Sequence, residues 1–279
     1  RSAVACRYSV SRYAACAART SDMASALLQS AMQRRALGSR HILPMAPNLA
    51  GSAHAALRRL STQGFSLFEV RTYAMQPGAK ALPPSVEPAL LGEWRSFSGG
   101  ETNNVHSIRG WASYQQMGDA LLEEVDADEA AGQLRQQRSV AMVEATQALS
   151  ACGLPGAALY TPPSPVNGER AVWELRTYQL QLGYETVPQF LQLFQEGLAE
   201  KLAVDDSGAS ELATLLYSDN GSLNVVIELW RHASLARSQE SRRASRKATR
   251  WRQAINDIAK LAVTFDTQLM RPTPRSPWA

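Results

Sequence analysis

The chain has no run of 18 uninterrupted apolar residues, although hydrophobic residues fill 45% of its 279 positions. A membrane-spanning helix needs about that length, so the sequence predicts globular cores and no transmembrane segment. Cysteine is scarce: Cys6 and Cys16 lie near the start, and Cys152 stands alone. After residue 62 the sequence therefore excludes an intrachain disulfide and a metal site built from cysteines only.

Motifs that identify a reaction are missing as well. The sequence contains no glycine-rich phosphate loop, no nucleophile elbow and no paired-cysteine motif. His106 and His232 have no second ligand at a recognisable spacing, so we interpret both as polar residues near strand ends. The sequence thus predicts no catalytic residue, no cofactor and no metal site, and it leaves open whether the protein is an enzyme.

Acidic residues are nearly absent from residues 1–62, which contain nine arginines, no lysine and one acid, Asp22. The net charge of +4 therefore hides a mildly acidic remainder, with 20 basic against 24 acidic residues. An Ala-, Ser- and Arg-rich leader is typical of an organellar presequence. We expect residues 1–62 to be cleaved or disordered, with Met23 as an alternative start and residues 1–22 upstream of it. The other interpretation is a disordered basic tail that binds acidic surfaces.

What the chain does contain is a repeat. Residues 67–78 (LFEVRTYAMQPG) and 172–183 (VWELRTYQLQLG) are near copies, with Glu69 and Glu174 105 positions apart. Such a period indicates one domain-sized unit used twice, which we divide into a first repeat, 63–165, and a second, 166–279. The second copy has an amphipathic helix pattern from Thr186, whereas the first has a proline-rich stretch at the matching place. The first repeat is therefore predicted to lack its first helix.

The second repeat predicts the order β, α, β, β, α, β. Strands are expected at 173–180, 211–217, 223–230 and 261–270, with an Asn220-Gly221 hairpin turn and a long helix over 233–257. Such a unit forms an antiparallel sheet with both helices on one face, which leaves the other face bare. The predicted α+β fold is therefore two tandem ferredoxin-like βαββαβ repeats, packed sheet to sheet as an intrachain dimeric α+β barrel.

In both repeats, the first strand carries Glu, Arg and Tyr on one face and apolar residues on the other. We expect the apolar face to meet the helices and the polar face to lie between the sheets. The predicted inter-sheet cluster consists of Glu69, Arg71, Tyr73, Glu174, Arg176, Tyr178 and Glu228. It could bind a small polar ligand or transfer protons. Alternatively its Glu and Arg residues pair across the junction, because buried charges need partners; the repetition of the triplet favours pairing.

A basic run follows in the predicted long helix. Its predicted partner-binding face consists of Arg243, Arg246, Lys247 and Arg250. This face could bind an anionic membrane surface or the acidic stretch 119–129, or it could simply be solvated. The acidic body and the lack of interleaved aromatic residues argue against nucleic acid.

Four segments together resemble the NIPSNAP family. They are the Glu-Leu-Arg-Thr-Tyr strand at 174–178, the run 224–235, the arginine-rich helix with Trp251, and the Met-Arg-Pro-Thr-Pro-Arg-Ser-Pro end at 270–277. The match covers roughly residues 66–279 and is tighter in the second repeat. The resemblance implies a dimeric α+β barrel. It favours the mitochondrion, in the matrix or at the matrix face of the inner membrane, over the plastid.

The resemblance further implies a protein that acts through binding, as an interaction module, a homo-oligomer or an accessory subunit of a larger mitochondrial complex without evident catalysis. The alternative is a small-molecule-binding protein or enzyme that uses the inter-sheet pocket, mainly through Arg176, Tyr178 and Glu228. The tail at 271–279 could dock a partner through Pro277-Trp278, or it could lie along its own barrel.

Overall fold

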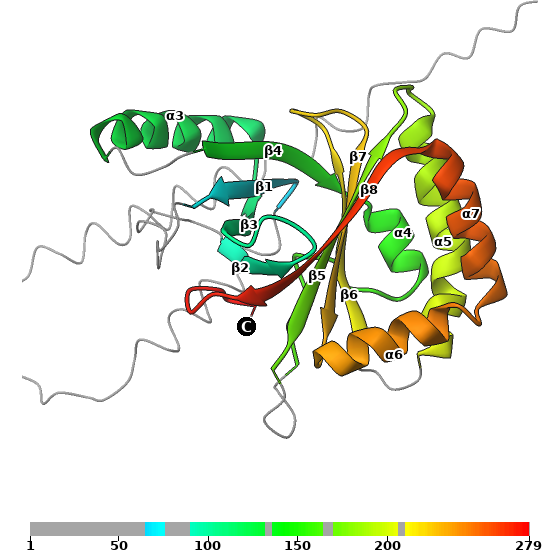
Figure 1. Ribbon diagram of the computed structural model, residues 1–279. Helices are drawn as coiled ribbons and strands as arrows, with labels where there is room; N and C mark the ends of the chain where they lie inside the picture. The colour runs from blue at the N-terminus through cyan, green and yellow to red at the C-terminus, as the bar shows by residue number, and fades with distance from the viewer. Residues whose placement is uncertain (1–64, 76–89, 132–135, 164–169, 206–209, 279) are drawn as a thin grey trace, which may run out of the picture. The chain divides into compact units, whose positions relative to one another are not determined.

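The computed structural model describes residues 65–75, 90–131, 136–163, 170–205 and 210–278 (Figure 1). The expected presequence and the proline-rich stretch of the first repeat lie outside the described residues. The strands are β1 (Leu67–Ala74), β2 (Leu90–Ser98), β3 (Asn104–Trp111), β4 (Gln136–Glu144), β5 (Val172–Leu180), β6 (Ser210–Ser218), β7 (Val225–His232) and β8 (Ala262–Pro272). The helices are α3 (Tyr114–Ala131), α4 (Thr146–Ala151), α5 (Thr186–Val204), α6 (Leu235–Ser245) and α7 (Thr249–Leu261).

These strands form a closed barrel in the order β1-β3-β2-β8-β5-β7-β6-β4, with every pair antiparallel. The barrel consists of two sheets with the same internal order, β4-β1-β3-β2 in the first repeat and β8-β5-β7-β6 in the second. The predicted α+β fold, an intrachain dimeric α+β barrel, is therefore confirmed. The two sheets also hydrogen-bond at their edges, β2 to β8 and β4 to β6, so closure leaves none of these strands as a free edge.

Local sequence signals explain the elements of the second repeat. A hairpin joins β6 to β7 as predicted, but through a six-residue loop, 219–224, and not through a tight turn at Asn220-Gly221. Gly221, in this loop, has a φ of +93°, a conformation that favours glycine. The helix predicted from Thr186 is α5, whose Phe190 and Phe194 are fully buried. Helices α5, α6 and α7 lie on the outer side of this repeat's sheet, whereas α3 lies beside the first repeat (Figure 1).

The prediction of one long helix over 233–257 is wrong, because the helix breaks after α6 and restarts as α7. The Glu200 carboxylate, on α5, accepts hydrogen bonds from the backbone N–H groups of Arg250 and Trp251. Those groups belong to the first turn of α7, where no helical carbonyl precedes them. A contact with another helix thus sets the start of α7.

Aromatic and aliphatic side chains from both repeats fill the barrel interior, including Phe68, Met142, Trp173 and Leu216. Trp278 from the C-terminal tail joins them. Its ring stacks on Trp173 with planes 6° apart and centroids separated by 5.9 Å, and it is only 4% exposed. The tail therefore lies along its own barrel, and the expectation of an exposed Pro277-Trp278 docking strip is wrong.

Candidate functional site

The polar residues of the two repeated strands lie on the outer side of the barrel. Phe68 and Trp173 belong to one apolar cluster shared by the two sheets, whereas Tyr178 packs edge-to-face on Phe190 of α5. Because neighbouring side chains on a strand point to opposite faces, the polar set shares the side of Tyr178. This set is Glu69, Arg71, Tyr73, Glu174, Arg176, Tyr178 and Glu228.

The prediction that this cluster lies between the sheets is therefore wrong. Closing two sheets into a barrel creates an interior that both repeats must fill, and apolar side chains fill it at the lowest desolvation cost. The charged residues lie instead on the side where the helices are. In the predicted cluster, Arg71 pairs with Glu69 and Arg176 pairs with Glu174, each within its own repeat.

In the first repeat the cluster centres on Glu69, which is fully buried. Its carboxylate accepts hydrogen bonds from Arg71 Nε and from Ser139 Oγ, the latter at 2.6 Å. The Tyr73 hydroxyl accepts from Arg71 Nη1 at 3.2 Å and from Arg109 Nη2 at 3.1 Å. One carboxylate and one phenol thus hold two guanidinium groups.

In the second repeat the cluster centres on Glu174, which is 1% exposed. Oε1 accepts from Arg176 Nε at 2.8 Å and from Arg242 Nη2 at 2.9 Å, and Oε2 accepts from His232 Nε2 at 3.0 Å. Burial by itself raises the pKa of Glu174, but the His232 hydrogen bond and the two arginine charges outweigh it and hold this pKa well below its ordinary value. Burial lowers the pKa of His232, so its Nε2–H donates while Nδ1 accepts from Ser210.

Arg176 connects Glu174 to Glu228. Its Nη1 lies 3.4 Å from Glu228 Oε2, which also accepts from the Trp230 indole. Burial works against the charge on Arg176, but the two carboxylates raise its pKa above the ordinary value. Burial, followed by the charge of Glu228, raises the pKa of Tyr178 well above 10.0, so this phenol stays protonated.

Lys201 of α5 completes the cluster, and sequence reasoning missed it. Its side chain is 3% exposed, and its Nζ lies 3.9 Å from the ring centre of Trp230 and 5.5 Å from that of Trp251. It donates a hydrogen bond to Ser245 Oγ at 3.3 Å. Burial, then the Arg176 charge, lowers the pKa of Lys201 to about 8, against the opposing effect of the carboxylates.

A signal for Lys201 was present in the sequence. Phe194, Leu198 and Lys201 follow one another at the spacing of a single helix face, and both apolar residues are fully buried. A lysine on the buried stripe of an amphipathic helix needs a polar environment on the surface that the helix covers.

These residues line a cavity of about 910 Å³, called here the helix-side cavity, between the sheet and helices α6 and α7. Its charged lining residues are Glu174, Arg176, Lys201, Arg242, Arg246 and Arg252. Its apolar lining includes Trp251, Ile255, Ile258, Val263 and Phe265. The cavity contains Glu174, Arg176 and Tyr178 from the predicted cluster, while Glu228 contacts it through Arg176.

The four residues of the predicted basic helix face do not lie on one helix, because the helix breaks between α6 and α7. Arg243 lies in the last turn of α6 and Arg250 in the first turn of α7, with Arg246 and Lys247 in the turn between them. All four side chains are exposed. Arg246 alone of the four lines the helix-side cavity.

The barrel interior also holds a space of about 350 Å³, lined by residues of both repeats. His106 is the third residue of β3. Its Nδ1 is 3.0 Å from Thr72 Oγ1, and its Nε2 is 3.1 Å from both Ser96 Oγ and Gln268 Oε1. Burial lowers the pKa of His106 to about 4, so the ring is neutral. None of the predicted cluster residues lines this interior space.

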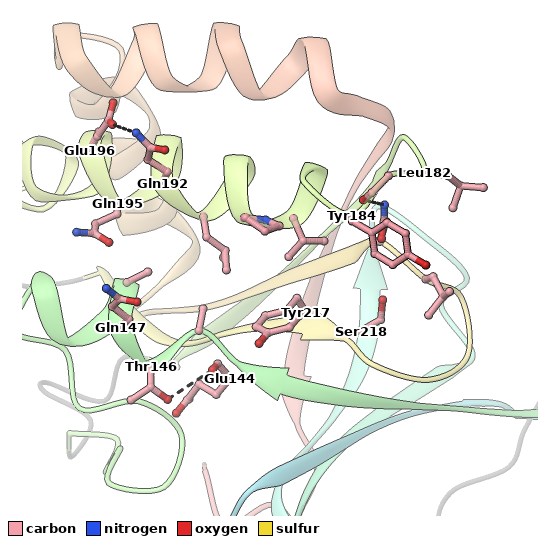
Figure 2. A pocket seen from close by; sticks show the side chains of 18 residues that line it. Glu144, Thr146, Gln147, Leu182, Tyr184, Gln192, Gln195, Glu196, Tyr217 and Ser218 are labelled. Atoms are coloured by element: carbon pink, nitrogen blue, oxygen red, sulfur yellow. Dashed lines mark hydrogen bonds between the residues drawn. The ribbon is translucent and has the colours of Figure 1, made fainter. Parts of the chain in front are cut away.

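A third hollow, of about 990 Å³, lies between α4 and α5 (Figure 2). At its mouth Leu182 is 82% exposed and Tyr184 is fully exposed. The Asn224 side chain donates hydrogen bonds to the carbonyl groups of Gln181 and Gly183, at 2.7 and 3.0 Å. The loop that carries these two apolar side chains is thus held in place. We call this hollow the α4–α5 groove; sequence reasoning missed it.

Comparison with known proteins finds a family match in the second repeat. Residues 173–277 match the NIPSNAP family model. The second repeat is thus similar to the NIPSNAP family. The chain is also similar to a protein named Protein NipSnap homolog from Dictyostelium discoideum, with 25% identity over 209 residues, which are 72% of this chain and 83% of that protein.

Solved structures are similar to this chain as well. A NIPSNAP family protein from Agrobacterium tumefaciens is 24% identical, covering 43% of this chain and 100% of its own, with a TM-score of 0.36. An anthrone oxidase-like protein is 9% identical, covering 78% of this chain and 96% of its own, with a TM-score of 0.51. At 9% identity the likeness to the anthrone oxidase-like protein concerns the fold alone. Among the helices of the described residues, none is long and apolar enough to cross a membrane.

Proposed function

We propose that this NIPSNAP-type protein works in mitochondria as a protein-interaction module, an accessory subunit that joins a larger complex through the α4–α5 groove. The observation that carries the proposal is the position of Leu182 and Tyr184. Both are exposed apolar side chains on a loop that Asn224 holds by hydrogen bonds. Contiguous exposed apolar surface marks interaction sites, and a fixed loop lowers the entropy cost of binding.

The groove favours an amphipathic helix of the partner. Val187 and Leu191 on α5 are spaced four residues apart and line the groove. The polar lining combines the side-chain amides of Gln147, Gln192 and Gln195 with the carboxylates of Glu144 and Glu196 (Figure 2). A third helix between α4 and α5 would place its own apolar stripe on this wall. Hydrogen-bonding residues would flank that stripe.

The mitochondrial location rests on the composition of residues 1–62. A fusion of these residues to a fluorescent protein is expected to enter mitochondria and to be shortened on import. Import into plastids would support the alternative organelle. A diffuse, unprocessed fusion would contradict the presequence and leave a basic tail.

The groove is tested by placing a charge on it. Tyr184→Arg is expected to move the full-length protein, in native separation of organelle extracts, from a high-mass species to the mass of the free chain. Leu159→Arg is the matched control, since Leu159 is 63% exposed and outside the groove. Co-migration of Tyr184→Arg with the unmodified protein would refute the proposal. A dimer of the purified protein that Tyr184→Arg dissociates would identify a second copy as the occupant.

The alternative function was a ligand or reaction in the pocket between the sheets. The residues predicted for that pocket, Arg176, Tyr178 and Glu228, lie instead on the helix side of the sheet. The observation that now favours small-molecule binding is the helix-side cavity. It is separated from the α4–α5 groove by α5 and has a different chemistry.

A further inference from the structure

The helix-side cavity holds more positive charge than its own carboxylate neutralises. Arg176 and Arg242 both contact Glu174, and Arg176 also contacts Glu228. The remaining cations of the lining are Lys201, Arg246 and Arg252. Such an excess in a concave site attracts anions.

Lys201 is the decisive residue. Its ammonium group has three N–H donors, and among the described residues its hydrogen bond goes to one neutral acceptor, Ser245 Oγ. Its other close neighbours are the faces of Trp230 and Trp251. No carboxylate of the described residues forms an ion pair with it, although its side chain is 97% buried. A buried cation without a counter-ion is costly, and an anion in the cavity would remove that cost.

The rest of the cavity is apolar and partly open. Val263 and Phe265 on β8 are 64% and 52% exposed, and the Phe265 ring stacks on Tyr178 at 4.6 Å between centroids. Trp251 and Ile255 on α7 face the same cavity. A ligand that buried these surfaces would gain roughly 25 cal/mol per Å² of apolar area.

We propose that the helix-side cavity binds a small amphipathic carboxylate, with the carboxylate group at Lys201 and the apolar chain or ring against Trp251 and Phe265. The volume of about 910 Å³ suits a ligand of this size. Arg242 is 43% exposed in its side chain and still reaches Glu174, so it guides the anion inward at the entrance. This site is independent of the α4–α5 groove.

The probe ligand is dodecanoate, and the control ligand is dodecanol, which has the same chain length but no charge. Binding to the full-length chain is measured by titration calorimetry and by the fluorescence of the tryptophans near Lys201. At pH 7, dodecanoate is expected to bind at least tenfold more tightly than dodecanol, and acetate, which lacks the apolar chain, is expected not to bind. Equal affinity for dodecanoate and dodecanol would overturn the proposal.

Lys201→Met removes the charge while keeping a side chain of similar length. It is expected to weaken dodecanoate at least tenfold and to leave dodecanol within about twofold. Lys260→Met is the control, because Lys260 is 75% exposed and pairs with Asp257 outside the cavity. Unchanged dodecanoate affinity in Lys201→Met would overturn the assignment of the carboxylate group.

Proton uptake gives a test that needs no variant. The groups around Lys201 are Arg176, which lowers its pKa, and Glu228, Glu174 and Asp205, which raise it. An anion beside Lys201 adds to the second group, so binding near pH 8 is expected to take up protons. Titration in buffers of different ionisation enthalpy measures this, and absence of uptake would contradict contact with Lys201. Failure of this site leaves the mass shift of Tyr184→Arg unaffected, so the two proposals fail separately.

Discussion

Trp230 lies under the ammonium group of Lys201, and the strand position equivalent to Trp230 in the first repeat is Arg109. The register shows this equivalence, because Trp230 pairs with Glu174 and Arg109 pairs with Glu69. In the second repeat the extra cation comes from helix α5, at 3.9 Å from the indole centre. In the first repeat a guanidinium from strand β3 occupies that strand position. The duplicated Glu-Arg-Tyr cluster has therefore diverged at this strand position, where one repeat has a strand arginine and the other has an indole under a lysine from a helix.

Lys201 makes stability depend on pH in an unusual direction. Its pKa falls from 10.5 to about 8 on folding, so below pH 8 the folded state carries a charged, buried lysine at full cost. As the pH rises towards 10.5, the folded state loses this proton first and the cost disappears. Lys201→Met lacks the effect, so its stability relative to the unmodified protein is expected to fall by about 2 kcal/mol between pH 7 and 10. Urea unfolding of both proteins measures this, and a pH-independent difference would contradict it.

Glu174→Gln is expected to lower the free energy of unfolding by about 3–5 kcal/mol, because Arg176, Arg242 and His232 lose their shared carboxylate. The folded pKa of Glu174 is lowered, so its contribution is present above pH 4.5 and is lost as the pH falls below that value. Glu240→Gln is the control, since that exposed carboxylate pairs with Arg237 at the surface and contributes at most about 1 kcal/mol. Equal effects of the two substitutions at pH 7 would show that the buried pairing is unimportant.

Two glycines in helices are expected to respond oppositely to alanine. A Cβ on Gly197 of α5 would lie 2.8 Å from Ala254 Cβ and 3.1 Å from Trp251 Cα, so α5 and α7 would have to separate. We expect Gly197→Ala to destabilise by about 1–3 kcal/mol despite better helix propensity. Gly118→Ala in α3 meets nothing within 4 Å and is expected to stabilise by up to about 1 kcal/mol. Thermal unfolding of both variants decides the matter, and stabilisation by Gly197→Ala would contradict the close helix packing.

Trp278→Ala is expected to cost about 3 kcal/mol, because Trp278 stacks on Trp173 and contacts Trp94 and Tyr160. Trp278→Phe keeps a ring in the same place and should cost less than half as much. Urea unfolding followed by circular dichroism measures both. An unchanged Trp278→Ala would mean that the tail does not stabilise the barrel.

Much of the sheet was readable from the repeat. Period-two alternation placed β1 and β5, and Asn220-Gly221 predicted that β6 and β7 form a hairpin, because both signals depend on neighbouring residues only. The length of the connecting loop was not predicted. The break between α6 and α7 was not readable. It depends on Glu200, a residue 50 positions from the backbone group that it caps.

The candidate sites likewise contain some contacts that the sequence predicted and others that only the tertiary packing created. Glu174, Arg176 and Glu228 were predicted to lie together, and β5 and β7 do pair with Arg176 opposite Glu228. Lys201 joined them through the packing of α5 across the sheet, and Tyr184 became part of a groove through the position of α4. Neither contact has a counterpart at short range in the chain.

The sequence by itself determined that Phe68 and Glu69, like Trp173 and Glu174, lie on opposite faces of their strands, since alternation is a property of the extended backbone. It did not determine which face would be enclosed. That was decided when β2 paired with β8 and β4 with β6, because an interior exists only after the two sheets close. The enclosed space was then filled by the side chains that lose least on leaving water, and the charges were left beneath the helices.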